Sequence, residues 1–264
     1  MRIALAVAGL VAVALCGCHR KEASPKASAP LPEPLSFSQV TPDSTVKMTL
    51  APVIAQEPGL RFRLYGDGVK ELKSFAAQAH GDRAHLAAKG LQTPPYQRDI
   101  AWTLTAATPR LLSARESWFD DTGGAHPNHG WNGLLWNIPE DRAIPRAELF
   151  RPDADQAKLE QGLCEAIKAA KVQRVGAQEA AEEAGSWPCP RWADSDFVFA
   201  PSTVHGKLGG LVFLFDPYSL GPYAEGDYQV TVPLAEFQGA LSPAYADEFA
   251  GAPEPLPPPP LPER

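Results

Sequence analysis

The sequence predicts an α+β fold: a mostly antiparallel sheet packed with two main helices in a single domain. Two stretches repeat apolar residues at intervals of three and four, and the segments around them alternate apolar and polar residues. The elements follow the order strands, helix, strands, helix, strands. Strands that follow one another through short connections pair antiparallel, so this order differs from that of a nucleotide-binding α/β fold.

The first half of the domain is expected to begin with two short strands, 46–54 and 60–66, split by a turn at 57–59. An amphipathic helix is then expected over 66–90, with 81–82 as a candidate break. Its apolar stripe consists of Val69, Leu72, Phe75, Ala76, Ala79 and Leu86.

Alternation returns in 98–107, which predicts a strand with one apolar face made by Ile100, Trp102, Leu104 and Ala106. The segments 110–119 and 131–138 are expected to form a hairpin that is joined across 120–130. A second helix is expected from 152, because Leu159, Leu163, Ile167 and Ala170 recur at helical spacing. Three more strands are expected at 196–201, 210–218 and 227–237.

The N-terminus, residues 1–18, predicts a lipoprotein signal peptide. A basic second residue precedes thirteen apolar residues, 3–15, a run too short to span a bilayer and typical of a secretory leader. The segment 15–18 resembles the lipobox of bacterial lipoproteins, although Cys16 replaces the usual small residue. We therefore expect a lipid on Cys18 that anchors the chain in the cell envelope, with an ordinary cleaved signal as the alternative. His19 after the cysteine favours the outer membrane, facing the periplasm.

Two Pro-rich segments flank the domain. Residues 19–44 are rich in Pro, Ala and Ser and are expected to form an extended tether. Residues 252–264 are expected to form an extended, unpacked tail. The remaining 45–251 is long enough for one α+β envelope domain with its own core.

The charge of the chain argues against nucleic acid as a partner and is compatible with a basic protein as a partner. The formal net charge is −7, from 24 basic and 31 acidic residues. Cleavage before Cys18 removes Arg2, and 23 minus 31 then gives −8. Nucleic acid requires a basic face, whereas an acidic protein attracts a basic partner.

Cys164 and Cys189 are expected to form a disulfide bond. They are the only cysteines that remain outside the signal segment, and the cell envelope is oxidising. Neither cysteine belongs to a Cys-x-x-Cys motif, which makes a metal pair the weaker alternative.

The hairpin connection is the main candidate site because loops of this length commonly carry recognition. The candidate binding residues in it are Asp121, Gly123, Gly124, His126, Asn128, His129 and Trp131. A structural role accounts for most of them, since adjacent glycines let the chain reverse and Asp or Asn side chains bond local backbone. A binding loop on a rigid hairpin is compatible with that role.

A metal site and a catalytic site are the two more specific alternatives for the same loop. His126 and His129 with Asp120, Asp121 and His205 supply zinc-type ligands, but Pro127 disfavours a helix that would carry both imidazoles. Ser117, His126 and Asp121 supply triad residue types without the Gly-x-Ser-x-Gly elbow. Paired Asp120 and Asp121 point to opposite faces of a strand, unlike a glycosidase pair. We therefore assign no catalytic residue, no metal and no cofactor.

Two blocks of the chain, 113–150 and 211–241, resemble a bacterial domain of unknown function. The first carries Gly-Gly-Ala-His-Pro-Asn at 123–128, followed by a strand, a turn and a Leu-Phe element before a helix. The second carries Pro-Tyr, then Gly-Pro-Tyr-Ala-Glu-Gly at 221–226 and a Val-Pro strand. The resemblance covers most of 45–250.

The resemblance implies an α+β domain that acts at the cell wall by binding. Such domains occur in RsiV-type lysozyme-sensing anti-sigma factors and beside the catalytic domain of PdaC-type peptidoglycan deacetylases. His126, Asn128 and Tyr223 match its pattern, and Tyr223 thereby joins the candidate binding residues. We expect a non-enzymatic, lipid-anchored protein that binds peptidoglycan or a lysozyme-like protein. A hydrolase that uses 120–130, with or without a metal, and a structural or assembly lipoprotein are the alternatives.

Overall fold

A computed structural model describes residues 35–257. The predicted signal peptide, the predicted lipidation site Cys18 and most of the predicted tether lie outside these residues, as does the end of the predicted tail. Within the described part of the chain, no helix is both long and apolar enough to cross a membrane.

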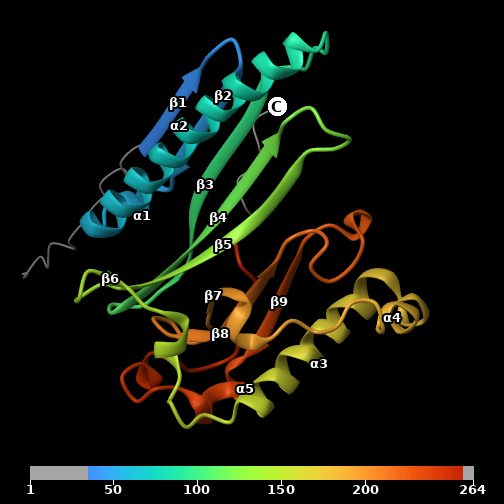
Figure 1. Cartoon of the computed structure of the whole chain (residues 1–264). Coiled ribbons are helices and arrows are strands. Elements are labelled where there is room, and N and C mark those ends of the chain that lie inside the picture. The colour runs from blue at the N-terminus through green and yellow to red at the C-terminus, as the bar shows by residue number, and fades with distance from the viewer. Residues whose placement is uncertain (1–34, 258–264) are drawn as a thin grey trace, which may run out of the picture. The chain divides into compact units, whose positions relative to one another are not determined.

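The first half of the domain forms a six-stranded sheet in the order β1-β2-β3-β4-β5-β6 (Figure 1). Neighbouring strands pair antiparallel except β2 and β3, which are parallel because a helix crosses over between them. The strands are β1 (Leu35–Val40), β2 (Ser44–Leu50), β3 (Tyr96–Ala107), β4 (Leu111–Asp121), β5 (Asn128–Asn137) and β6 (Arg142–Ala143).

The crossover consists of a short α1 (Pro52–Ala55) and a long α2 (Pro58–Ala88), which packs on β2 and β3. The predicted strand 60–66 was therefore wrong. Pro58 begins the helix, and Leu60 and Leu64 are buried one turn apart while Phe62 between them is 84% exposed. The helix continues through the candidate break at 81–82.

The second half forms a three-stranded antiparallel sheet, β7-β8-β9, covered by helix α3. Its strands are β7 (Asp196–Pro201), β8 (Leu208–Phe215) and β9 (Tyr228–Pro233). The helices are α3 (Gln156–Val175), α4 (Ala177–Glu183) and α5 (Leu234–Phe237). Single turns of 3₁₀ helix occur at η1 (Arg146–Leu149), η2 (Trp192–Asp194), η3 (Tyr223–Glu225), η4 (Gln238–Ala240) and η5 (Ala246–Glu248). The predicted stripe of Leu159, Leu163 and Ile167 is buried.

The two sheets share buried contacts, so the described residues form one mixed α+β domain, as predicted. Ser113 on β4 accepts a hydrogen bond from the Phe199 backbone N–H at 2.9 Å and bonds Thr105 on β3 at 2.6 Å. All eight residues of β8 are buried. Gly133 on β5 faces β7, where an added Cβ would lie 2.5 Å from the Phe197 carbonyl oxygen. This close approach explains why only glycine fits at that position.

A β-bulge corrects the predicted apolar face of β3. The pairing of β3 with β4 shifts between Leu104 and Ala106. Ile100, Trp102 and Leu104 pack in the core beneath α2, whereas Ala106 packs in the core of the second sheet. The extra residue in the bulge reverses the alternation, which a simple two-residue period does not anticipate.

Parts of both predicted flanking segments belong to the folded domain. Strand β1 lies within the predicted tether 19–44 and pairs with β2. At the other end, the Thr203 N–H donates to the Ala252 carbonyl at 3.0 Å, and the Glu254 N–H donates to the Pro201 carbonyl at 2.9 Å. These backbone bonds pack the start of the predicted tail 252–264 against the end of β7.

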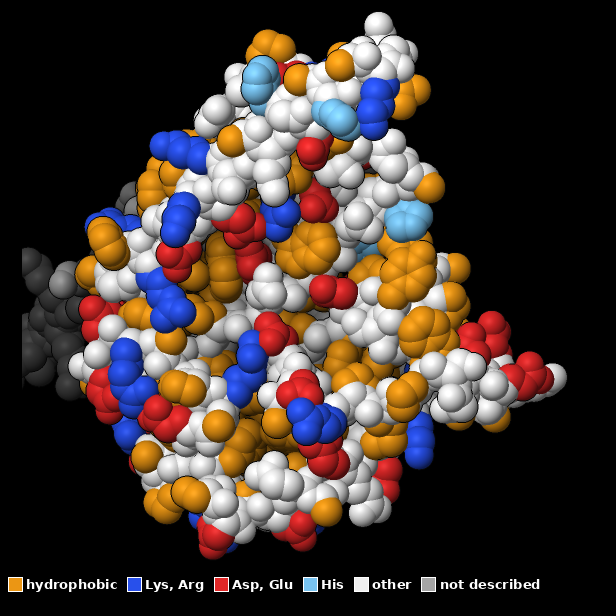
Figure 2. Space-filling model, viewed as in Figure 1, with side chains coloured by type: hydrophobic (Ala, Val, Ile, Leu, Met, Phe, Trp, Pro, Cys, Tyr) orange, Lys and Arg blue, Asp and Glu red, His pale blue; other side chains and the backbone are white. Residues whose placement is uncertain are grey.

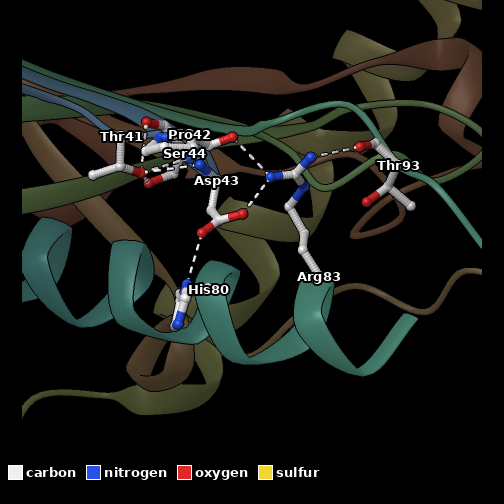
Figure 3. A network of polar contacts seen from close by, with 7 residues as sticks. All are labelled: Thr41, Pro42, Asp43, Ser44, His80, Arg83 and Thr93. Atoms are coloured by element: carbon white, nitrogen blue, oxygen red, sulfur yellow. Dashed lines mark hydrogen bonds and ion pairs between the residues drawn. The ribbon is translucent and has the colours of Figure 1, made fainter. Parts of the chain in front are cut away.

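The turn between β1 and β2 is tied to α2 by a polar network (Figure 3). The Asp43 carboxylate contacts His80 at 2.7 Å and pairs with Arg83. Arg83 also donates to the carbonyls of Pro42 and Thr93, at 2.8 and 2.9 Å. The hydrogen bond from His80 is the largest of the effects that lower the pKa of Asp43. One guanidinium thereby joins the β1–β2 turn to the segment that enters β3.

The Cys164–Cys189 disulfide is present, as predicted. It connects α3 to the segment after α4, with the two Cα atoms 5.4 Å apart. Because the bond closes a loop between residues 25 apart in sequence, it limits the conformational freedom of the α3–α4 segment in the unfolded chain.

Replacing both cysteines, in Cys164→Ala with Cys189→Ala, is expected to lower the free energy of unfolding by about 3 kcal/mol. The reason is the lost constraint on a loop of roughly 26 residues in the unfolded state. Urea unfolding of parent and variant measures the difference, and the parent under reducing conditions should reproduce it. An unchanged midpoint in both would contradict the expectation.

Candidate functional site

The turn of the β4–β5 hairpin is built from the candidate residues Asp121 and Gly123. It spans 122–127 and is shorter than the predicted 120–130. The Asp121 carboxylate accepts a hydrogen bond from the Gly123 N–H at 2.8 Å, and Gly123 has φ of +75°. Both residues shape the turn, because a left-handed backbone here favours glycine. Gly124 and His126 follow in the exposed part of the loop.

Three aromatic rings from two distant segments meet at this loop. The His126 imidazole stacks on the Tyr223 ring with centroids 3.9 Å apart and planes inclined by 25°. Tyr218 lies 5.5 Å from Tyr223 and 6.4 Å from His126 by ring centroids. The Pro127 carbonyl accepts the Tyr223 hydroxyl at 2.7 Å and lies 2.9 Å from His126 Nδ1. We call His126, Tyr218 and Tyr223 the tip surface.

Tyr218 is held in an unusual backbone conformation that leaves its ring exposed. Its φ is +71°, and its side chain is 55% exposed. A bulky residue in the left-handed region costs roughly 1–2 kcal/mol relative to its ordinary conformation. Such strain often marks a functional position. The space-filling view shows histidine and hydrophobic atoms adjoining beside the end of the hairpin (Figure 2).

Two carboxylates next to the strands of the second sheet, Asp216 and Asp227, bind the residues of β5 that follow the tip surface. The Trp131 backbone N–H donates to Asp216 at 2.7 Å, and its indole N–H donates to Asp227 at 2.8 Å. His129 Nε2 lies 3.6 Å from the same Asp227 carboxylate. Burial raises the pKa of Asp216, opposed by the hydrogen bond from the Trp131 N–H. Trp131 and His129 therefore act as anchors, whereas Asn128 at the start of β5 is exposed.

A buried arginine packs against the Trp131 ring. The Arg115 residue on β4 is 1% exposed, and its guanidinium carbon lies 4.9 Å from the Trp131 ring centroid. It donates to the Gln229 side chain at 2.8 Å and to the Pro257 carbonyl at 2.9 Å. Burial lowers the pKa of Arg115, opposed by the charge of Asp227. This stacking fixes the indole that anchors the loop.

The side chains considered for a triad bond other groups. Ser117 donates to the Ala101 carbonyl at 3.3 Å, and Asp121 accepts from the turn backbone. Asp120 pairs with Arg98 at 3.2 Å. Within residues 35–257, no three or more His, Cys, Asp or Glu side chains are grouped so that they could hold a metal ion.

Sequence reasoning missed Glu116, the most perturbed carboxyl in the hairpin. The residue is 7% exposed and accepts a hydrogen bond from the Asn132 amide at 2.7 Å. Burial is the largest cause that raises the pKa of Glu116 to about 7. The sequence did contain a signal for this residue. Leu112, Ala114 and Glu116 alternate along the strand, which places the carboxyl on the same face as two apolar residues that are buried.

The variant Glu116→Gln is expected to change how stability depends on pH. The folded-state pKa of Glu116 lies above its ordinary value of 4.5, so the parent loses stability as the pH rises from about 4.5 through 7. A shift of this size corresponds to about 3 kcal/mol. The variant should lack this loss and gain on the parent by up to that amount between pH 5 and pH 8, measured by urea unfolding.

The matched control for that measurement is Glu179→Gln, which removes the same charge from an exposed position on α4. It should follow the parent at both pH values. If Glu116→Gln also followed the parent, the buried carboxyl would not be the source of the pH dependence.

Comparison with known proteins identifies part of the chain. Residues 147–235 match the family described as "Protein of unknown function (DUF3298)". No curated protein matches the sequence. The matched residues include α3, α4 and the second sheet, together with Tyr218 and Tyr223, whereas the β4–β5 hairpin precedes them.

Two solved structures have a similar fold. A DUF3298 family protein from Pseudomonas aeruginosa has a TM-score of 0.57 and 18% identity, with 84% of this chain and 98% of that chain covered. A DUF3298 family member from Bacteroides fragilis has a TM-score of 0.57 and 17% identity, with coverages of 82% and 95%. At these identities the likeness establishes the fold, which extends beyond the matched residues. Over residues 147–235, which are part of the single described domain, the chain is similar to the DUF3298 family.

Proposed function

We propose that this chain is a non-enzymatic, lipid-anchored envelope protein whose tip surface binds a cell-wall component or a wall-active protein such as lysozyme. The observation that carries the proposal is the group of three rings, in which His126 and Tyr218 are exposed, Tyr223 is half-buried, and Tyr218 has a strained backbone. Tyrosine is enriched in protein interfaces because its rigid, amphipathic ring gives large contact area at a low cost in conformational entropy.

The tip surface is suited to recognition because its rings are fixed before a partner arrives. Tyr223 is bonded to the Pro127 carbonyl, and His126 stacks on Tyr223. The loop that carries His126 is anchored through Trp131 to two carboxylates of the second sheet. A preorganised surface loses little conformational entropy on binding, and affinity rises accordingly.

The charge of the surroundings favours a cationic partner. Asp121 ends β4 next to the hairpin turn and Asp227 lies beside His129, within a chain of formal net charge −7. Complementary charge accelerates encounter and is screened by salt. A basic wall-active protein fits this pattern better than an acidic one.

Binding is tested by calorimetric titration of the full chain with lysozyme and, separately, with soluble peptidoglycan fragments, at low and high salt. The parent should bind one of them saturably, and a lysozyme complex should weaken as salt increases. His126→Ala and Tyr218→Ala should each weaken binding about tenfold or more, as truncation of an interface anchor does. Phe62→Ala, which removes an exposed aromatic ring from α2, is the matched control.

The variant Tyr218→Gly separates recognition from folding. Glycine adopts positive φ without strain, so the variant should be as stable as the parent or about 1 kcal/mol more stable. Its binding should nevertheless fall as in Tyr218→Ala. A well-folded parent that binds neither lysozyme nor peptidoglycan, or a tip variant that binds like the parent, would remove the proposal.

The lipid anchor is tested at Cys18 in the intact precursor. Radiolabelled palmitate fed to expressing bacteria should label the parent and not Cys18→Ser, because the thiol accepts the diacylglyceryl group. Immunoblotting of both chains controls for expression. Equal labelling of the two would exclude Cys18 as the lipidated residue.

A further inference from the structure

Helices α3 and α4 enclose an apolar pocket. Helix α4 lies beside the end of α3 (Figure 1), yet none of the α4 residues is buried. The pocket between the two helices has a volume of about 430 Å³. Packed helices normally interlock their side chains and leave few voids larger than a water molecule. The space between α3 and α4 is therefore much larger than helix packing alone leaves.

One wall of the pocket comes from α4 and the segment that follows it. Its alanines recur at intervals of three and four residues, which places them on one face of the helix. Because their side chains are single methyl groups, this face leaves the space in front of it open. Trp187 adds an aromatic ring to the wall and is half-buried. The residues of this wall are Ala177, Ala180, Ala181, Ala184 and Trp187.

The opposite wall comes from α3 and includes the Cys164–Cys189 disulfide. Ile167 in this wall is buried, whereas Val172 is 44% exposed. Both cysteines line the pocket, and their bond holds the segment after α4 against α3. The disulfide thus limits how far the two walls can separate. Val172 leaves apolar surface in contact with water, which a ligand in the pocket would cover.

The charged residues of the lining are two lysines, and one of them is free to bind a ligand. The Lys171 ammonium is buried, pairs with Glu183 at 2.7 Å and donates to the Leu220 carbonyl at 2.6 Å. Lys168 also lines the pocket, but it is exposed and has no ion-pair partner within residues 35–257. The pocket therefore presents one uncompensated positive charge beside apolar walls.

The acidic residues of α4 lie on its outer face. Glu179 and Glu182 are exposed and fall on the side of the helix opposite to the alanines of the pocket wall. Glu182 accepts a hydrogen bond from Gln178 at 3.0 Å on that side. Figure 2 shows acidic side chains at the outer edge of this part of the molecule. Their negative charge repels an anion from α4 and favours Lys168 on α3 as its partner.

We infer that this pocket binds the aliphatic chain of a fatty acid, with the carboxylate of the ligand at Lys168. Small-molecule pockets are concave and mostly apolar, carry a few polar groups that orient the ligand, and have volumes of roughly 300 to 1,000 Å³. The volume of 430 Å³ equals roughly fourteen times the 30 Å³ that one water molecule occupies. A methylene group is similar to water in size, so a chain of about ten carbons fits.

A fatty acid matches this lining better than a sugar does. The alanines, Ile167 and Val172 offer no side-chain hydrogen bonds, so sugar hydroxyls would lose their bonds to water without replacement. A purely apolar compound would leave Lys168 unused. The pocket shares no residue with the tip surface, so this inference goes beyond the proposed function and does not depend on it.

Binding is measured by calorimetric titration of the full chain with decanoate, and tryptophan fluorescence reports on Trp187. Decanoate should bind at one molecule per chain. It should also raise the midpoint of urea unfolding, because a ligand of the folded state stabilises that state. Octanoate is two methylene groups shorter and should bind about tenfold more weakly.

Filling the pocket with protein atoms should remove binding. Ala180→Leu places a larger side chain in the space between the helices, and the affinity for decanoate should fall about tenfold or more while circular dichroism and urea unfolding show a folded chain. Ala181→Leu is a second variant of the same wall, with the same expected loss. Ala169→Leu is the matched control, because it adds the same side chain at an exposed position of α3 outside the lining. It should bind decanoate like the parent.

The role of the charge is tested with Lys168→Glu and with decanol, which has the same chain but no carboxylate. The variant should bind decanoate about tenfold more weakly, because an attraction becomes a repulsion, and should bind decanol like the parent. Tyr218→Ala, at the tip surface, should bind decanoate like the parent. Decanoate binding that does not saturate, pocket variants that bind decanoate like Ala169→Leu, or a Lys168→Glu chain that binds decanoate like the parent would each overturn the proposal.

Discussion

The free edge of β5 is closed by side-chain carboxylates instead of another strand. The N–H groups of Trp131 and Gly133 on this edge donate to Asp216 and Asp196, which lie at the ends of the second sheet. An open edge exposes unpaired donors and invites pairing with other chains, and acidic acceptors prevent that. The same bonds tie the hairpin to the second sheet and so set where its turn lies. The contact between His126 and Tyr223 depends on this attachment, because the two rings belong to segments almost one hundred residues apart.

The alternation of β4 gives the hairpin two chemically different faces. Arg115 points to the second sheet, where Gln229 and the Trp131 ring enclose its charge. Glu116 points to the α2 side, where Asn132 is its hydrogen-bond partner and burial raises its pKa to about 7. Neighbouring residues of opposite charge are thus buried separately instead of neutralising each other. A one-residue slip in register would bury each in the wrong environment, so the pair specifies the register of the strand.

The periodicity of the sequence predicted the fold class, the hairpin, α3 and the second sheet, because each has a regular apolar face. It failed at 60–66, where Leu60 and Leu64 fit a helix and a strand equally over so short a stretch. It failed at Ala106 because the bulge depends on pairing with β4. For the site, the sequence located His126, His129 and Trp131, but their partners Asp216 and Asp227 are distant in sequence. No local pattern encodes the contacts between Tyr218, Tyr223 and His126, although both segments were singled out separately.

Backbone strain marks the tip surface as a feature that folding alone does not explain. The backbone of Tyr218 is strained while its ring remains exposed, so folding gains little from that side chain. A ligand that covers the exposed ring gains apolar contact there only when bound. Binding energy at the tip surface then adds to stability by linkage, so ligand and fold favour each other.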